Sequence, residues 1–218
     1  IPNTYFIYPN FAVFLRVLRI FESLNRNSRT GIGGSQGTIQ KNSEMDFQTI
    51  LAKRRSTRRF LPRPVPRELI DALLRDALTA PSARNSRSTR FLAVDDPALI
   101  ARMAEMRDYG SSFMRHAPAV VLVLGNPTKS DLWRENAAIA ATILQLACVD
   151  RGLASCWVHV HGRPRRQDAP EGEQAEAFLR ELLSLPGQTR ILCAVALGHS
   201  DFTPAPLPPA DDEPVIWL

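Results

Sequence analysis

The chain has 218 residues, 44% hydrophobic and 22% charged, which are proportions that can build a sizeable core and that exclude low-complexity disorder. Its 27 Lys and Arg residues outnumber its 22 Asp and Glu residues, but residues 1–44 hold five basic and two acidic side chains, so residues 45–218 carry 22 against 20. This small remaining excess argues against nucleic acid as a partner.

Residues 1–44 are expected to lie outside the folded domain. Their apolar stretch, 5–21, is interrupted by proline and arginine, so the sequence predicts neither a membrane span nor a signal peptide. Residues 23–43 are polar and Gly-rich, as in a linker, and Met45 then opens a segment with helical spacing of apolar residues. A translated leader and a genuine arm both remain open, and the predicted domain is 45–218.

The domain interleaves predicted helices and strands. Beyond a first short helix near Phe47, apolar spacing and start signals predict helices over 67–80, from 97 to about 108, over 131–151 and over 173–183. Short apolar runs bounded by turn residues predict strands over 90–94, 119–124, 154–160 and 191–197. The sequence therefore predicts an α+β fold, with helices covering a mixed sheet of about four or five strands.

The helix expected over 131–151 is unusual, because its middle, residues 137–149, is apolar or small on every side of a helical wheel. A chain of this size rarely encloses a whole helix, so the Ala-rich segment suggests a close-packed subunit interface. We expect a homodimer centred on this helix, and a core helix of a monomer is the alternative.

The three cysteines, Cys148, Cys156 and Cys193, stand in apolar stretches without the spacing of a disulfide framework or a metal site. We expect them to be small buried side chains in a reducing compartment, which favours the cytoplasm, and we predict no metal.

The densest charge lies in residues 53–67, which hold seven basic and no acidic residues. Arg54, Ser56 and Arg58 could bind a phosphate through guanidinium forks and a hydroxyl group. A solvated basic face is one alternative and a nucleic-acid patch is another, although the latter usually has more aromatic residues than Phe60 alone.

Four segments, taken together, resemble the FMN-dependent nitroreductase family. They are RRSTRRF at 54–60, APSARN at 80–85, RGLASCW at 151–157 and VALGH at 195–199, in the right order along the domain. The resemblance implies a nitroreductase-like α+β flavoprotein with a mixed, mainly antiparallel sheet. It also implies an intertwined homodimer with one FMN in each of two sites at the subunit interface.

The resemblance implies the role of the basic cluster. Arg54, Arg55 and Ser56 match the positions that hold the FMN phosphate and ribityl chain. Arg58 matches the basic residue near the pyrimidine edge of the ring, where a cation would stabilise the negative charge of reduced FMN.

Two other segments supply the remaining cofactor-binding residues that the resemblance implies. Pro81, Ser82 and Ala83 match positions that reach the site from the partner subunit, and Asn85 matches a residue that hydrogen-bonds the flavin. Cys156 and Trp157 lie where the family passes its backbone close to the ring.

The sequence departs from the family pattern at two places. Asn85 is not followed by the frequent x-Q-P-W, which suggests a changed substrate pocket. No Lys or Arg follows Gly198, where many members place a cation for the phosphate, so phosphate binding must rest on the Arg54 cluster or on the arginines at 163, 165 and 166.

The implied activity is the reduction of a nitroaromatic, quinone or other conjugated small molecule by NAD(P)H through FMN, in a ping-pong hydride transfer. Such chemistry needs positioning more than a general base, and we predict no catalytic side chain among the four histidines or the carboxylates. A redox-inactive flavin-binding homologue and, less favoured, a basic nucleic-acid-binding module are the alternatives.

Overall fold

The computed structural model describes residues 45–205, 216 and 217, so the expectations for residues 1–44 concern residues outside the described part. No helix within the described part is long and apolar enough to cross a membrane.

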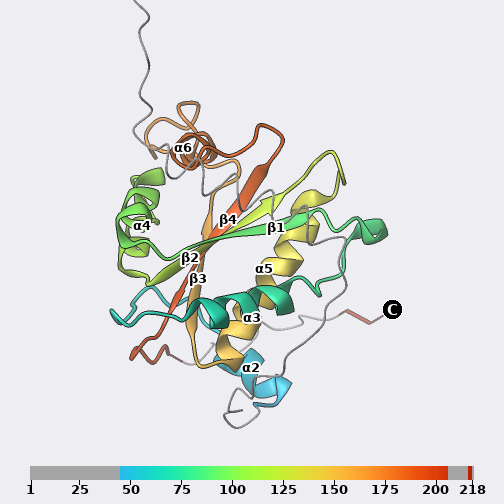
Figure 1. The fold of residues 1–218 in the computed structure, drawn as a ribbon, viewed down its shortest axis with the longest axis vertical. Helices are drawn as coiled ribbons and strands as arrows, with labels where there is room; N and C mark the ends of the chain where they lie inside the picture. The colour runs from blue at the N-terminus through green and yellow to red at the C-terminus, as the bar shows by residue number, and fades with distance from the viewer. Residues whose placement is uncertain (1–44, 206–215, 218) are drawn as a thin grey trace, which may run out of the picture.

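The described residues form five α-helices and four strands (Figure 1). The helices are α2 (Phe47–Lys53), α3 (Arg67–Ala77), α4 (Pro97–Met103), α5 (Trp133–Asp150) and α6 (Ala175–Leu182). The strands are β1 (Thr89–Val94), β2 (Ala119–Gly125), β3 (Ala154–His159) and β4 (Arg190–Gly198). Short 3-10 helices are η1 (Ala83–Asn85), η2 (Ala104–Met106) and η3 (Ser112–His116).

The sheet has the strand order β1-β2-β4-β3, and all three strand pairs are antiparallel. A parallel bridge between Ser56 and Ser155 adds the segment after α2 to the edge of β3. All seven residues of β2 are buried, as expected of a central strand that is covered on both faces. The predicted α+β fold is confirmed.

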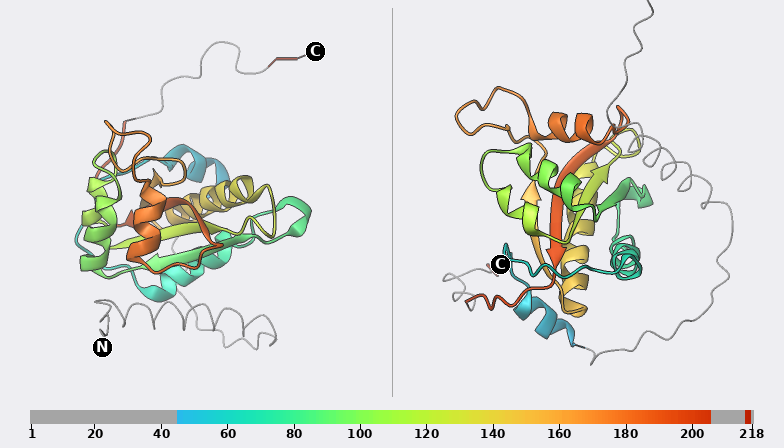
Figure 2. Two further views of the ribbon diagram at one scale, coloured as in Figure 1. Left: turned by 90° about the horizontal axis from the view of Figure 1, so that it is seen from above. Right: turned by 60° about the vertical axis from the view of Figure 1, so that its left-hand side comes forward.

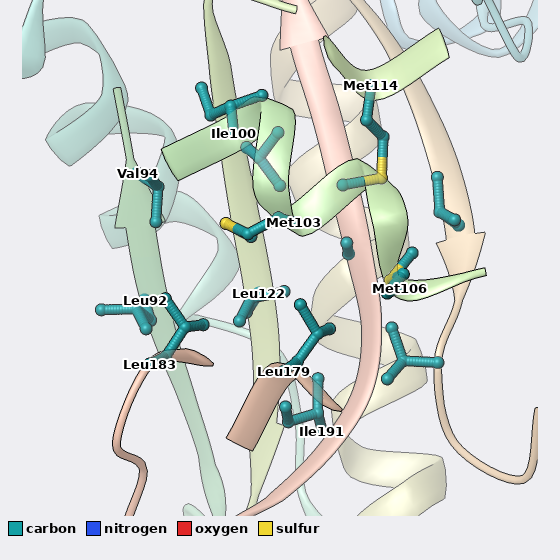
Figure 3. Close-up of a cluster of buried hydrophobic side chains, with 14 of the residues drawn as sticks. Leu92, Val94, Ile100, Met103, Met106, Met114, Leu122, Leu179, Leu183 and Ile191 are labelled. Atoms are coloured by element: carbon teal, nitrogen blue, oxygen red, sulfur yellow. The ribbon is translucent and has the colours of Figure 1, made fainter. Parts of the chain in front are cut away.

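The sheet separates two layers of helices. Helices α3 and α5 cover one face, and α4, η2, η3 and α6 cover the other (Figure 2). On the second face, two methionines of α4 and η2, Met103 and Met106, pack with Leu122 of β2 and Leu179 of α6 (Figure 3). Unbranched Met side chains fit the irregular space that short helices leave.

The helix expected from 97 to about 108 is present, but its last turn is a 3-10 turn and it ends at Met106. Helix α4 ends at Met103, one 3-10 turn follows, and Arg107 is extended at φ −144° and ψ 147°. The Arg107 side chain donates hydrogen bonds to the carbonyl oxygen of Tyr109 and, across the fold, to that of His159, so a long-range contact accompanies the extended backbone at this residue.

Helix α5 is not covered on every side within one chain. Ala140 is 1% exposed and faces the core, whereas Ile139 is 42% exposed and Leu132, just before the helix, is 45% exposed. The rest of the described chain leaves the side of α5 that carries Ile139 open. The helix would be surrounded on all sides, as the sequence predicts, only if a further surface covered this side.

The three cysteines are free and buried, as predicted. Burial raises the pKa of the Cys148 thiol to about 12 and the pKa of Cys193 well above its ordinary value. Both thiols are therefore protonated at neutral pH and pack as small apolar side chains.

Candidate functional site

The basic residues that follow α2 lie beside the first residues of β3. The helix ends at Lys53, and the backbone N–H of the following residue, Arg54, still donates to the carbonyl oxygen of Ile50. The chain then becomes extended, and the backbone N–H of Thr57 donates to the carbonyl oxygen of Ser155 at 3.0 Å. Arg54, Ser56 and Arg58 consequently stand beside β3.

Cys156 lies close to this cluster. Burial raises the pKa of its thiol, while the positive charges of Arg58 and Arg54 and a hydrogen bond from Ser56 act in the opposite direction. The structure therefore brings together these four residues, which the sequence places about 100 positions apart. Cys156 remains a protonated thiol, so we assign it no role as a thiolate nucleophile.

Several hydrogen-bond donors of this cluster have no acceptor within the described residues. Arg55 Nε and Trp157 Nε1 are buried and unpaired, although Arg55 Nη1 donates to the carbonyl oxygens of Ala52 and Arg54. Arg54 and Arg58 have no carboxylate partner in the described part, and the Arg58 guanidinium lies 5.9 Å from the centre of the Phe113 ring. Such donors suit an anionic or acceptor-rich ligand.

The loop of residues 81–88 has a strained backbone. Arg84, Asn85 and Arg87 have φ values of 51°, 50° and 46°, in the left-handed region that residues other than glycine seldom adopt. Such strain persists only where surrounding contacts enforce it, and it concentrates at functional sites. One of the contacts that hold the strained backbone lies within the loop, since Ser82 Oγ accepts a hydrogen bond from the backbone N–H of Arg87 at 3.0 Å.

The side chain of Asn136 in α5 holds this loop through hydrogen bonds. The sequence analysis did not identify this residue. Its Oδ1 accepts a hydrogen bond from the backbone N–H of Ala83 at 2.8 Å, and its Nδ2 donates to the hydroxyl groups of Ser86, Ser88 and Ser130. The residue is 3% exposed. The sequence signal that could have identified Asn136 is a single amide at the start of an otherwise apolar run. Such an amide is expected to be buried, and a buried amide needs hydrogen-bond partners.

One chain does not bring the two groups of predicted residues together. Figure 1 shows α2 beside the C-terminal end of α5, whereas the loop is attached near the N-terminal end through Asn136. Fourteen residues of helix separate Asn136 from Asp150, which is about 20 Å at 1.5 Å per residue. Pro81–Asn85 therefore lie far from Arg54–Arg58 of the same chain.

The segment after Gly198 lies beside the basic cluster but adds no cation to it. The carbonyl oxygen of His199 accepts from the backbone N–H of Leu61, and Asp201 forms an exposed ion pair with Arg59 at 3.2 Å. Of the alternative phosphate cations, Arg165 pairs with Glu173 and Arg166 pairs with Asp168. These two and Arg163 follow His159, at the opposite end of β3, so the geometry favours Arg54 for a phosphate.

His161 is engaged by a carboxylate away from the basic cluster. His161 Nδ1 lies 3.1 Å from Glu176, which also accepts from Arg190 and from the backbone N–H of Ile191. Burial tends to raise the pKa of Glu176, but these hydrogen bonds outweigh it and lower the pKa. Across the described residues, no three His, Cys, Asp or Glu side chains gather as metal ligands do.

Residues 51–108 and 105–199 match the sequence profile of the nitroreductase family. The chain belongs to the nitroreductase family. A protein of Methanothermobacter thermautotrophicus, provisionally named NADH dehydrogenase/NAD(P)H nitroreductase, is 29% identical over 167 residues, 75% of this chain and 82% of the relative. A protein of Archaeoglobus fulgidus with the same provisional name is 31% identical over 150 residues, 67% of this chain and 80% of the relative.

A solved structure supports the same assignment. The FMN-dependent nitroreductase of Clostridium difficile R20291 superposes with a TM-score of 0.72 at 31% identity, covering 77% of this chain and 96% of that protein. The nitroreductase fold that the sequence motifs predicted is confirmed.

Proposed function

We propose that this protein uses NAD(P)H to reduce a small conjugated acceptor, such as a nitroaromatic compound or a quinone, by ping-pong hydride transfer through FMN. As a member of the nitroreductase family, it is an NAD(P)H-dependent FMN oxidoreductase. The identity of the acceptor and the ping-pong order are what we add. We also infer a reducing, cytoplasmic location from the three free, buried cysteines.

The donors at the start of β3 carry this proposal, because their chemistry fits FMN. Arg54 and Ser56 would hold the phosphate and ribityl chain, together with Arg55 if its guanidinium leaves the end of α2. When bound, FMN supplies a ring that accepts hydride from a nicotinamide and passes it to an acceptor stacked in the same place. Arg58 would place its positive charge at the pyrimidine edge, where negative charge accumulates on reduction.

We propose that a second copy of the chain completes each site. The loop Pro81–Ala83 with Asn85 cannot reach Arg54 of its own chain, yet Asn136 holds it in one defined shape. Apolar surface remains open on the chain at Phe47 (61% exposed) and Leu51 (41%) of α2, at Leu132, which precedes α5, and at Ile139 of α5. Covering that surface with the same surface of a partner would give the intertwined homodimer.

We further propose that residues 1–44 contribute nothing to the cofactor site. The family match begins at residue 51, and every residue assigned to FMN follows Met45. A variant that lacks residues 1–44 should bind FMN and dimerise like the full chain, and loss of either property would contradict this boundary.

Initial-rate kinetics test the proposed reaction. With NADH or NADPH varied against a nitroaromatic acceptor, a ping-pong enzyme gives parallel lines in double-reciprocal plots, and a panel of quinones and nitroaromatics identifies the acceptor class. Intersecting lines would contradict the ping-pong order. A protein that binds FMN but oxidises neither nucleotide with any acceptor would be the redox-inactive homologue instead.

A further inference from the structure

A polar cavity lies on the face of the sheet that α4 and α6 cover, between η2, η3 and the loop of residues 163–173. Its volume is about 540 Å³, and none of the residues assigned to FMN lines it. Four arginines line it, namely Arg107, Arg115, Arg165 and Arg166. Three carboxylates, Glu105, Asp108 and Glu173, also border it.

Arg107 is held rigidly at this cavity. Its Nε and Nη1 each donate at 3.1 Å to a backbone carbonyl oxygen, those of Tyr109 and His159, and its guanidinium lies 4.5 Å from the centre of the Tyr109 ring. Gly110, at φ +68°, leaves room for Nη2, because a Cβ there would lie 2.7 Å from that nitrogen. The side chain is thus positioned in advance, and among the described residues Nη2 makes no hydrogen bond.

Two of the four arginines form ion pairs within the described residues, and two do not. Glu173 pairs with Arg165 at 2.8 Å, and Asp168, outside the lining, pairs with Arg166 at 2.7 Å. Arg107 and Arg115 have no carboxylate partner in the described part of the chain, and Arg115 donates only to the carbonyl oxygen of Ser112. Burial lowers the pKa of Arg107, although Tyr109 acts in the opposite direction. The lining as a whole holds four arginines against three carboxylates, an excess of one positive charge.

The cavity also neighbours the proposed flavin site. Phe113 of η3 lies under the Arg58 guanidinium, and Ser112 and Arg115 of the same short helix line the cavity. A small molecule that stacks on the flavin beside Arg58 could therefore extend past η3 to Arg107 and Arg115.

We propose that this cavity is an oxyanion subsite in which Arg107 and Arg115 bind a phosphate group of the nucleotide reductant. The inference rests on the proposed function, since it takes NAD(P)H as the molecule that reaches the flavin. Guanidinium groups suit phosphate because their planar N–H pairs match two of its oxygens. A carboxylate on the electron acceptor has the same chemistry and is the competing source.

The test compares Arg115→Ala and Arg107→Gln with the control Arg102→Ala, which removes an exposed arginine of α4 that does not line the cavity. Binding of adenosine 2′,5′-bisphosphate and of inorganic phosphate to the full chain is measured by calorimetry, which needs no turnover. We expect each cavity variant to weaken binding of the bisphosphate by about ten- to a hundred-fold and the control to leave it unchanged. Because Arg115 is exposed, its variant tests the site even if Arg107→Gln folds poorly.

Steady-state kinetics then identify the source of the anion. A fall of kcat/KM for NADPH alone assigns the 2′-phosphate to the cavity, and an equal fall for NADPH and NADH assigns the pyrophosphate; either result supports the proposal. A fall confined to carboxylate-bearing acceptors would contradict it, as would unchanged bisphosphate binding in both variants. An inactive chain that still binds the bisphosphate through Arg115 would refute the proposed reaction but not the anion site.

Discussion

The side chain of Asn136 accepts a hydrogen bond from the backbone N–H of Ala83 at 2.8 Å and so joins the core helix α5 to a strained surface loop. The loop carries Pro81–Ala83 and Asn85, which we assign to the partner's flavin site. Asn136 touches none of the proposed ligand itself. It is a positioning residue, since its amide fixes the shape in which the loop is presented.

Replacing Asn136 by Ala should weaken FMN binding. The change leaves the N–H of Ala83 and three serine hydroxyl groups without the amide, which costs about 1–3 kcal/mol of folding stability. Without these hydrogen bonds the loop residues can leave their left-handed backbone conformations. FMN affinity by fluorescence titration and the visible circular dichroism of bound FMN report on the loop. Gln188→Ala, which removes an exposed amide between α6 and β4, is the control, and unchanged affinity and dichroism in Asn136→Ala would contradict the role.

Replacing Arg54 by Ala should reduce FMN affinity by about ten- to a hundred-fold, because a charge-assisted contact with phosphate contributes about 1.5–3 kcal/mol. The effect should be large since no Lys or Arg follows Gly198. Equilibrium dialysis measures it, with Lys53→Ala, an exposed neighbour, as the matched control. Full retention of FMN by Arg54→Ala would show that the phosphate binds elsewhere.

Replacing Arg58 by Ala should lower the reduction potential of the bound flavin more than it lowers FMN affinity. The guanidinium faces the pyrimidine edge in our assignment, so its charge matters most when the ring is anionic. A redox titration against a reference dye gives the potential. An equal potential in the variant and the parent protein would place Arg58 away from the ring.

Replacing Ile139 by Arg should prevent dimerisation and FMN binding together. The side chain is 42% exposed in one chain, so a single subunit can accommodate the charge, whereas a close-packed interface cannot. Ala140 would be a poor choice because it is buried within its own subunit. Sedimentation and flavin absorbance test the pair of effects, and a monomer that binds FMN stoichiometrically would contradict the shared site.

Replacing Glu176 by Gln should remove part of the acid sensitivity of folding. The pKa of Glu176 is lowered in the folded state, so its ionised form stabilises the protein fully above the ordinary value of 4.5 and this contribution disappears as pH falls through the folded pKa. Near neutral pH the free energy of unfolding of the variant should be about 1–3 kcal/mol lower, since Arg190 and the N–H of Ile191 lose a charged acceptor. Urea unfolding from neutral pH to below 4.5 should show the two proteins converging; parallel curves would contradict this.

The fold was largely predictable because its signals are local. The apolar run of β2 and the stop at Gly152 after α5 follow from neighbouring residues alone. The extended backbone at Arg107, beyond the 3-10 turn that follows α4, was not predictable, since it accompanies a contact with the carbonyl oxygen of His159, 52 residues away. Asn136 was missed for the same reason: its partners come from the loop and from Ser130.

Single-turnover reduction under anaerobic conditions tests the central claim most directly. The full chain, purified with FMN, is mixed with NADPH or NADH, and the blue flavin absorption band is followed before and after addition of a nitroaromatic acceptor. We predict that the nucleotide bleaches the band stoichiometrically and that the acceptor restores it. A protein that binds no FMN, or whose bound FMN neither nucleotide bleaches, would contradict the assignment of this chain as an NAD(P)H-dependent flavin oxidoreductase.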